Sequence, residues 1–138
     1  MRFLHLTHTN KNNVMAILYT CYLIEEKGAE LLEQFDNVHN NIHRHHSTIE
    51  FGPKSTELAE DLTTIEITGR LTTNLVDCLI VSKENNLSKN ENPHITLSTA
   101  NNIKPFASNN EIKNNYDKIV WFDSPIELPV RIVTFFNF

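Results

Sequence analysis

The chain has 138 residues, of which 40% are hydrophobic and 21% charged, and this size and composition predict one domain over residues 1–138 with a buried core. Lys and Arg number 12 against 17 Asp and Glu, and the formal net charge of -5 excludes the basic face that long duplex nucleic acid requires. No apolar window approaches the roughly 18 residues of a membrane helix, and the N-terminus is too short and polar for a signal peptide. We therefore expect a monomer in the cytoplasm, which would be the host cytoplasm if the Asn-rich composition reflects a viral genome.

The first half of the chain predicts a strand, a helix and a second strand. Residues 14–24 form an apolar run of β-favouring side chains. Within residues 25–35, Ala29, Leu32 and Phe35 recur at helical spacing behind acidic residues of the first turn, which predicts a helix. Residues 45–52 alternate until a Gly-Pro pair ends the pattern, which predicts a short strand.

The second half predicts mostly strands. Residues 62–69 and 75–82 are rich in β-favouring side chains and are separated by polar residues, so we expect them to pair antiparallel. Residues 82–92 are almost all polar and predict a mobile loop, after which residues 93–98 alternate as a further strand. Residues 118–122 and 127–136 predict closing strands. Because strands outnumber helices without regular strand-helix alternation, the predicted class is α+β with antiparallel sheets.

Cysteine and glycine usage excludes two kinds of chemistry. Cys21 and Cys78 lie in apolar stretches without a CxxC pair, so we interpret both as reduced core thiols. The chain has three glycines, Gly28, Gly52 and Gly69, and their spacing forms neither of the Gly-rich phosphate-binding motifs GxxxxGK(S/T) and GxGxxG. Nucleoside-triphosphate chemistry of those two kinds is therefore excluded.

One motif occurs twice, as HSTI at residues 46–49 and as HITL at residues 94–97. Residues i and i+2 of a strand share a face, so His46 would lie beside Thr48 and His94 beside Thr96, while the apolar residues anchor the strands. If the strands lie side by side, the four side chains meet in one cavity. One imidazole could then take a proton from a nucleophile, the other could protonate a leaving oxygen, and the hydroxyls could bind phosphate oxygens. On spacing alone, two ordinary strands with surface histidines explain the pattern equally well.

Further segments accompany the two motifs in order. They are AILY at 16–19, the predicted helix at 25–35, HHSTIEFGP at 45–53, PHITLS at 93–98, Lys104-Pro105 and Ser108-Asn109. Over about residues 14–136 the chain thus resembles the two-histidine (2H, LigT-like) phosphoesterase superfamily, in its cyclic phosphodiesterase or 2′-5′ RNA ligase-like branch. The resemblance implies a bilobed pair of antiparallel sheets with outer helices and the two histidines in the groove between them. Residues 109–116 would supply the helix of the second lobe.

The resemblance also implies a function. It makes His46 and His94 the catalytic pair of a phosphodiesterase that needs no metal or other cofactor, with Thr48 and Thr96 on the phosphate. The substrate would be a nucleotide or short oligonucleotide with a 2′-oxygen in its phosphodiester: a 2′,3′-cyclic phosphate, a 2′-5′ linkage or a cyclic nucleotide. Lys104 could neutralise phosphate, as could Arg44 and Lys54, unless these cations are solvated loop charges.

Two other functions are alternatives. A nucleotide-binding module, or sponge, would use the same groove without cleaving its ligand. A metal cluster at His43, His45 and His46 is disfavoured, because on a strand the first two would point away from His46. His45 is then expected to flank the site on the core side or rim.

Several remaining residues have structural interpretations. The third His-x-Thr, at residues 5–7, predicts an edge strand with a surface histidine. Phe106 and Tyr116 could stack on a base, although Phe106 fits a core position equally well. Trp121 and Phe122 are expected to be packing residues.

Overall fold

The computed structural model describes residues 2–3, 16–52, 55 and 57–137. The described strands form one eight-stranded sheet in the order β3-β7-β6-β5-β8-β2-β4, with β1 paired to β8, and every pair is antiparallel. The strands are β1 (Arg2–Phe3), β2 (Ala16–Leu23), β3 (Asn41–Ile42), β4 (His46–Phe51), β5 (Asp61–Thr72), β6 (Val76–Val81), β7 (His94–Thr99) and β8 (Val120–Asn137). The helices are α1 (Glu26–Leu32), α2 (Ala107–Asn114) and the 3-10 helix η1 (Tyr116–Lys118). These elements confirm the predicted α+β class with antiparallel strands.

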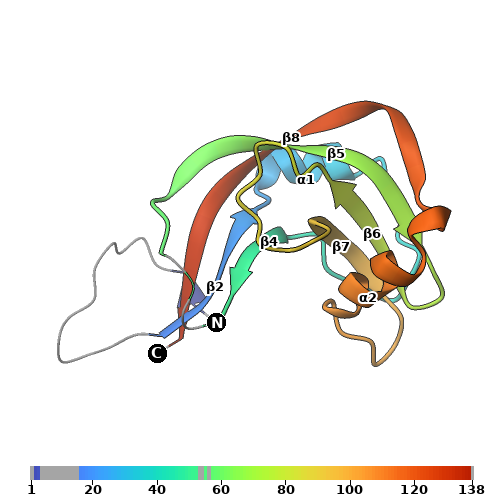
Figure 1. Cartoon of the computed structure of the whole chain (residues 1–138), viewed down its shortest axis with the longest axis horizontal. Coiled ribbons are helices and arrows are strands. Elements are labelled where there is room, and N and C mark those ends of the chain that lie inside the picture. The colour runs from blue at the N-terminus through green and yellow to red at the C-terminus, as the bar shows by residue number, and fades with distance from the viewer. Residues whose placement is uncertain (1, 4–15, 53–54, 56, 138) are drawn as a thin grey trace.

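Hydrogen bonds join the strands into one sheet, which bends across its two longest members, β5 and β8. Their register shifts where Ile67 pairs with Ile126 and Gly69 pairs with Trp121. Extra residues of this kind bend and twist a strand pair. Glycine permits the close approach, because a Cβ at Gly69 would lie 2.9 Å from the Val120 carbonyl oxygen. Figure 1 shows β5 and β8 arching over the molecule, with β2 and β4 under one end and β6, β7 and α2 under the other.

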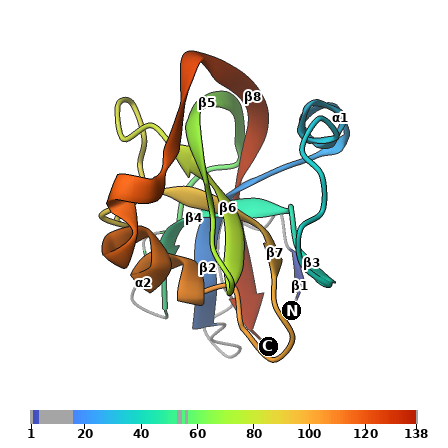
Figure 2. The same ribbon diagram turned by 90° about the vertical axis from the view of Figure 1, so that its right-hand side faces the viewer.

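Helix α1 is shorter than the predicted span and packs against the sheet through a glycine. Leu32 and Phe35 are buried, but Ala29 is exposed. Gly28 is the buried residue of the first turns, and a Cβ there would meet the Pro129 carbonyl oxygen at 2.9 Å. The absence of a side chain therefore lets α1 lie directly on β8. In the view of Figure 2, α1 and α2 lie on opposite sides of the strands.

Strands β5 and β8 are longer than the apolar patterns that predicted them. The predicted pairing of residues 62–69 with 75–82 is confirmed, but β5 continues through the polar residues to Thr72. The guanidinium of Arg70 donates to both carboxylate oxygens of Asp77 on β6, at 2.9 and 2.7 Å, and Thr72 donates to the same group at 2.8 Å. These bonds satisfy a fully buried carboxylate across the strand pair. Residues 118–122 and 127–136 likewise belong largely to the single strand β8.

The segment between β3 and β4 carries the chain from one end of the arch to the other. His43 N donates to Leu97 O at 2.8 Å and Arg44 N donates to Thr96 O at 3.0 Å, so this segment first follows β7. Arg44 has a φ of 69°, in the left-handed region, and the chain then enters β4 beside β2. The two strands that carry the repeated motif are thereby brought opposite each other.

The core confirms the interpretation of both cysteines. Cys21 and Cys78 are free thiols, fully buried, and burial raises the pKa of each to about 12. Cys78 packs in an apolar cluster with Ile112 of α2, and this cluster anchors the helix predicted for the second half of the chain. No helix in the described part of the chain combines the length and apolar character that crossing a membrane requires.

Candidate active site

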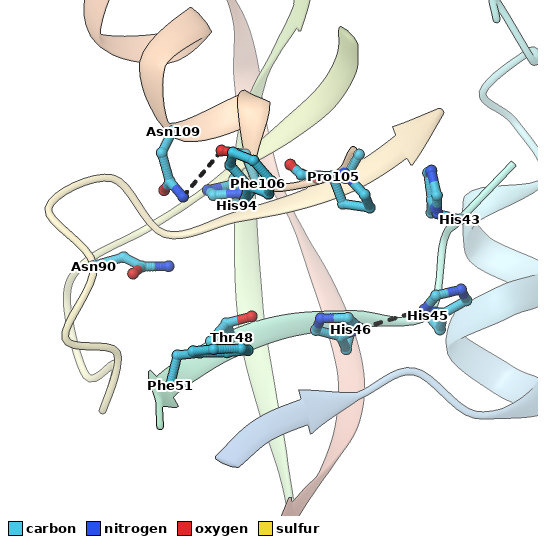
Figure 3. Close-up of a pocket in the computed structure, with 11 residues that line it drawn as sticks. His43, His45, His46, Thr48, Phe51, Asn90, His94, Pro105, Phe106 and Asn109 are labelled. Carbon is cyan, nitrogen blue, oxygen red and sulfur yellow. Dashed lines mark hydrogen bonds between the residues drawn. The ribbon is translucent and has the colours of Figure 1, made fainter. Parts of the chain in front are cut away.

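A cavity of about 460 Å³ lies between β4, β7 and the start of α2. This volume falls in the range of small-molecule binding sites, roughly 300–1,000 Å³. Figure 3 shows β4 and β7 on opposite sides of it, with His46 and Thr48 extending from one strand and His94 from the other. The lining consists of His43, His45, His46, Thr48, Phe51, Asn90, His94, Thr96, Pro105, Phe106 and Asn109. All four residues expected from the repeated motif therefore line the same cavity.

Alternation along β4 directs its motif residues into the cavity. Ser47 and Ile49 are buried in the core, whereas His46 and Thr48 are partly exposed and line the cavity. The register with β2 then shifts, since Thr48 pairs with Cys21 and Glu50 with Thr20. Such a bulge interrupts strict alternation.

Phe51 reaches the cavity as a consequence of that bulge. Its side chain is 78% exposed and its ring is stacked on Tyr19, with centroids 6.1 Å apart. Strict alternation along residues 45–52 would place Phe51 on the opposite face from His46, and hydrophobic alternation carries no signal for the bulge.

His94 is oriented by the backbone that precedes β7. Its Nδ1 lies 2.9 Å from the carbonyl oxygen of Asn92. Because a carbonyl can only accept, Nδ1 carries a hydrogen and donates it, which leaves Nε2 as the ring nitrogen available to a bound molecule. Ile95 and Leu97 are fully buried and hold the strand in the core.

Thr96 is tied to helix α2. Its Oγ1 lies 2.9 Å from Oγ of Ser108, a fully buried residue of the first turn of α2, and 3.4 Å from the Pro105 carbonyl oxygen. In the sequence, Ser108 is noted only as one of the segments that carry the family resemblance. Its contact with Thr96 makes it a further residue of the site.

The expectation that His43 and His45 point away from His46 is wrong, because both line the cavity together with it, but His45 does lie at the rim, one of the two positions expected for it. Neither belongs to β4, which begins at His46, and the left-handed Arg44 turns the chain between them. The His45 ring is exposed at the rim and lies 5.5 Å from that of His46, with an interplanar angle of 20°. His43 meets His45 edge-on, and its Nε2 lies 3.1 Å from Oγ1 of Thr99.

The environment favours neutral imidazoles at the site. Burial lowers the pKa of His46 to about 4, and the imidazoles of His45, His94 and His43 add to the lowering. Burial also lowers the pKa of His94, although the Asn92 carbonyl opposes that shift. The lining contains no carboxylate, so among the described residues the histidines are the side chains there that can serve as general acid or base.

Of the expected phosphate-binding cations, Arg44 and Lys104 belong to the described residues, and neither lines the cavity. The Arg44 guanidinium donates to Asn37 Oδ1 at 3.0 Å and to the carbonyl oxygens of Leu32 at 3.0 Å and Phe35 at 2.6 Å, so it closes the end of α1. Lys104 is exposed and directly precedes Pro105, which lines the cavity, but Lys104 itself is not in the lining. Lys54 lies outside the described residues, as does the His-x-Thr at residues 5–7.

Of the two candidate base-stacking residues, Phe106 lines the cavity and Tyr116 does not. Phe106 is 69% exposed and lines the cavity, so it is not a core residue. Tyr116 is outside the lining and its ring packs near Trp121, with centroids 5.6 Å apart. Phe122 packs on Phe35. Among the described lining residues, Phe51 and Phe106 are therefore the two with exposed phenyl rings.

The polar loop at residues 82–92 is anchored beside the site. Ser88 Oγ donates to the Thr48 carbonyl oxygen at 2.8 Å, Lys89 N donates to Ile49 O at 2.7 Å, and Leu87 N donates to the Tyr22 hydroxyl at 2.8 Å. These bonds cover the free edge of β4 and bring Asn90 to the cavity.

Within the part of the chain that the structure describes, no group of three or more His, Cys, Asp or Glu side chains is arranged to hold a metal ion. The ring of His45 contacts the rings of His43 and His46, and one hydrogen bond joins His45 to His46. Comparison of the chain with protein-family models, with curated proteins and with solved structures finds no match.

Proposed function

We propose that the chain is a metal-independent phosphodiesterase of the two-histidine type, acting on a small substrate with a 2′-oxygen in its phosphodiester. The observation that carries the proposal is that both His-x-Thr motifs supply their imidazoles and hydroxyls to one cavity. Two general acid-base groups and two hydroxyl donors are what displacement at phosphorus needs when no metal is used.

The hydrogen bonds of the two imidazoles support a division of roles. Burial lowers the pKa of His94, but its Nδ1–H donates to a carbonyl, and such a partner favours the protonated ring. His46 has an imidazole as its Nδ1 partner, and neighbouring imidazoles disfavour its protonation. We therefore assign His46 as the general base and His94 as the general acid.

With a 2′,3′-cyclic phosphate, the proposed reaction is a single displacement. His46 Nε2 takes a proton from water as the water oxygen bonds to phosphorus. The bond from phosphorus to one ribose oxygen breaks, and His94 Nε2 gives that oxygen its proton. Thr48 and Thr96 donate to the non-bridging oxygens, which carry the growing charge. With a 2′-5′ linkage, the neighbouring 3′-hydroxyl takes the place of water. The bond from phosphorus to the 5′-oxygen then breaks, His94 protonates that oxygen, and the product is a 2′,3′-cyclic phosphate.

The surroundings of the cavity support a nucleotide-sized substrate. The exposed rings of Phe51 and Phe106 offer two faces on which a base can stack. The net charge of -5 and the absence of Lys and Arg from the described lining do not suit a long polyanion. The 2′-oxygen itself rests on the family resemblance.

A substrate screen tests the proposal. The protein is incubated with a large molar excess of 2′,3′-cyclic nucleotides, 2′-5′ oligoadenylates or cyclic dinucleotides in the presence of a chelator, and products are separated by chromatography. We expect many product molecules per protein chain with at least one of these classes. Binding that stops at stoichiometry without product would instead identify a sponge, and turnover that requires added metal would contradict the proposed mechanism.

A further inference from the structure

The contact between His45 and His46 joins two adjacent residues that an ordinary strand would separate. Side chains of neighbouring strand residues point to opposite faces. Here the left-handed Arg44 precedes the pair and β4 begins only at His46, so both rings lie at the cavity, stacked 5.5 Å apart. Their Nδ1 atoms are 3.3 Å from each other, as the dashed line in Figure 3 marks.

A hydrogen bond between two imidazole nitrogens needs one hydrogen, so it couples the tautomers of the two rings. If His46 carries the hydrogen at Nδ1, its Nε2 has a free lone pair and can act as a base. If His45 carries it, His46 must hold its own hydrogen at Nε2 and cannot take a second proton there. The identity of the donor therefore decides whether His46 can act as a base.

The position of His45 favours the first arrangement. Its ring is exposed at the rim, so in the neutral ring the hydrogen can lie on Nε2 and be donated to water, while Nδ1 accepts from His46. His43 supports the ring from the other side by an edge-on contact with centroids 6.0 Å apart, and is itself held near the Thr99 hydroxyl. His46 is the more enclosed ring, and no carboxylate in the described lining competes for its Nδ1 hydrogen.

We propose that His45 is a positioning residue for His46: it accepts the Nδ1 hydrogen of His46 and so holds the base in the tautomer whose Nε2 is unprotonated. This inference rests on the proposed phosphodiesterase function. It differs from the carboxylate partner common beside catalytic histidines, because a neutral imidazole orients the base without stabilising its protonated form as strongly.

Imidazole nitrogen NMR tests the tautomer independently of activity. Long-range proton-nitrogen spectra of the wild type, with His46 assigned by its loss in His46→Gln, are expected to show the Nδ1–H tautomer of neutral His46. In His45→Ala that tautomer should become mixed. His45→Asn should restore it, because the amide oxygen can accept the same hydrogen. A wild-type His46 with its hydrogen on Nε2, or an unchanged tautomer in His45→Ala, would overturn the inference.

Kinetics provide the second readout. In His45→Ala we expect kcat to fall about 10-fold or more, the range for partners that orient a functional histidine, with little change in KM. His45→Asp should move the acid limb of the kcat/KM profile to higher pH, because a carboxylate raises the pKa of His46. His39→Gln is the matched control, since His39 bonds to Thr73 O outside the cavity. If NMR shows the predicted tautomers but the protein turns over no substrate, the proposed phosphodiesterase function is refuted while the hydrogen bond between His45 and His46 is confirmed.

Discussion

Thr96 Oγ1 and Ser108 Oγ lie 2.9 Å apart in a buried contact that joins β7 to the first turn of α2. When two hydroxyls form a hydrogen bond, only one of them donates its hydrogen to the other. If Ser108 donates it, the hydrogen of Thr96 can go to the Pro105 carbonyl oxygen at 3.4 Å or to a phosphate oxygen in the cavity. Without Ser108, the shorter of the two contacts that fix the Thr96 hydroxyl is lost, and the longer bond to the Pro105 carbonyl oxygen is the one that remains.

Replacing Ser108 by alanine therefore should affect catalysis beyond its effect on folding. We expect Ser108→Ala to lower kcat/KM about 10-fold while the free energy of unfolding falls by about 1 kcal/mol, the usual contribution of one hydrogen bond. Ser98→Ala is the matched control, because Ser98 is equally buried on β7 but accepts from His39 N outside the cavity. Equal losses of activity in the two variants, measured alongside urea unfolding, would show that Ser108 acts only through stability.

The two threonines of the motif should each contribute a phosphate donor. Thr→Val keeps the β-branched shape and removes the hydroxyl, so Thr48→Val and Thr96→Val are expected to lower kcat by about 10- to 100-fold with smaller effects on stability. Thr68→Val, in β5 and outside the cavity, is the control. Steady-state kinetics at substrate saturation check the prediction, and normal turnover in both motif variants would rule out the proposed phosphate contacts.

The activity should depend on pH with an optimum below neutrality. His46 must be neutral to act as base, so kcat/KM rises as pH increases through its pKa of about 4. His94 must be protonated to act as acid, and because burial lowers its pKa below the usual value, kcat/KM falls again before pH reaches about 6.5. Two imidazoles with the usual pKa of about 6.5 would instead give a window around neutral pH. Burial of both rings could not be deduced from strand alternation, and it moves the expected window toward acid. A profile that rises steadily to about pH 9 would contradict two-histidine catalysis.

The exposed aromatic rings should affect binding more than chemistry. Base stacking contributes roughly 1–3 kcal/mol per base, so Phe51→Ala and Phe106→Ala should each raise KM about 10-fold with little change in kcat. Leu62→Ala is the matched control, since Leu62 is a large exposed apolar residue outside the cavity. An unchanged KM in both phenylalanine variants would place the base elsewhere.

The predictable part of this molecule is what local side-chain alternation specifies. The β4 and β7 patterns correctly place Ile49, Ile95 and Leu97 in the core and His46 and Thr96 at one cavity. Alternation is a property of neighbouring residues, so one sequence suffices to read it.

The rest depends on backbone irregularities and long-range contacts. The bulge that turns Phe51 into the cavity and the left-handed Arg44 that brings His45 to His46 have no signal in hydrophobic periodicity. Arg44 is held by carbonyl oxygens at the end of α1, and its preference for them over phosphate arises only when the chain is folded. The Thr96–Ser108 contact spans two elements and likewise needs tertiary structure.

The most direct test is turnover of a 2′,3′-cyclic nucleotide, a 2′-5′ oligoadenylate and a cyclic dinucleotide by the wild type, His46→Ala and His94→Ala, each with chelator present. We expect multiple turnovers of at least one substrate by the wild type. We also expect losses of at least about 10²-fold in each variant, because general acid or base groups contribute roughly 10²- to 10⁴-fold. Circular dichroism and unfolding of the variants verify that they remain folded. Activity that survives either substitution, or that disappears from the wild type with chelator, would contradict a metal-independent His46–His94 pair.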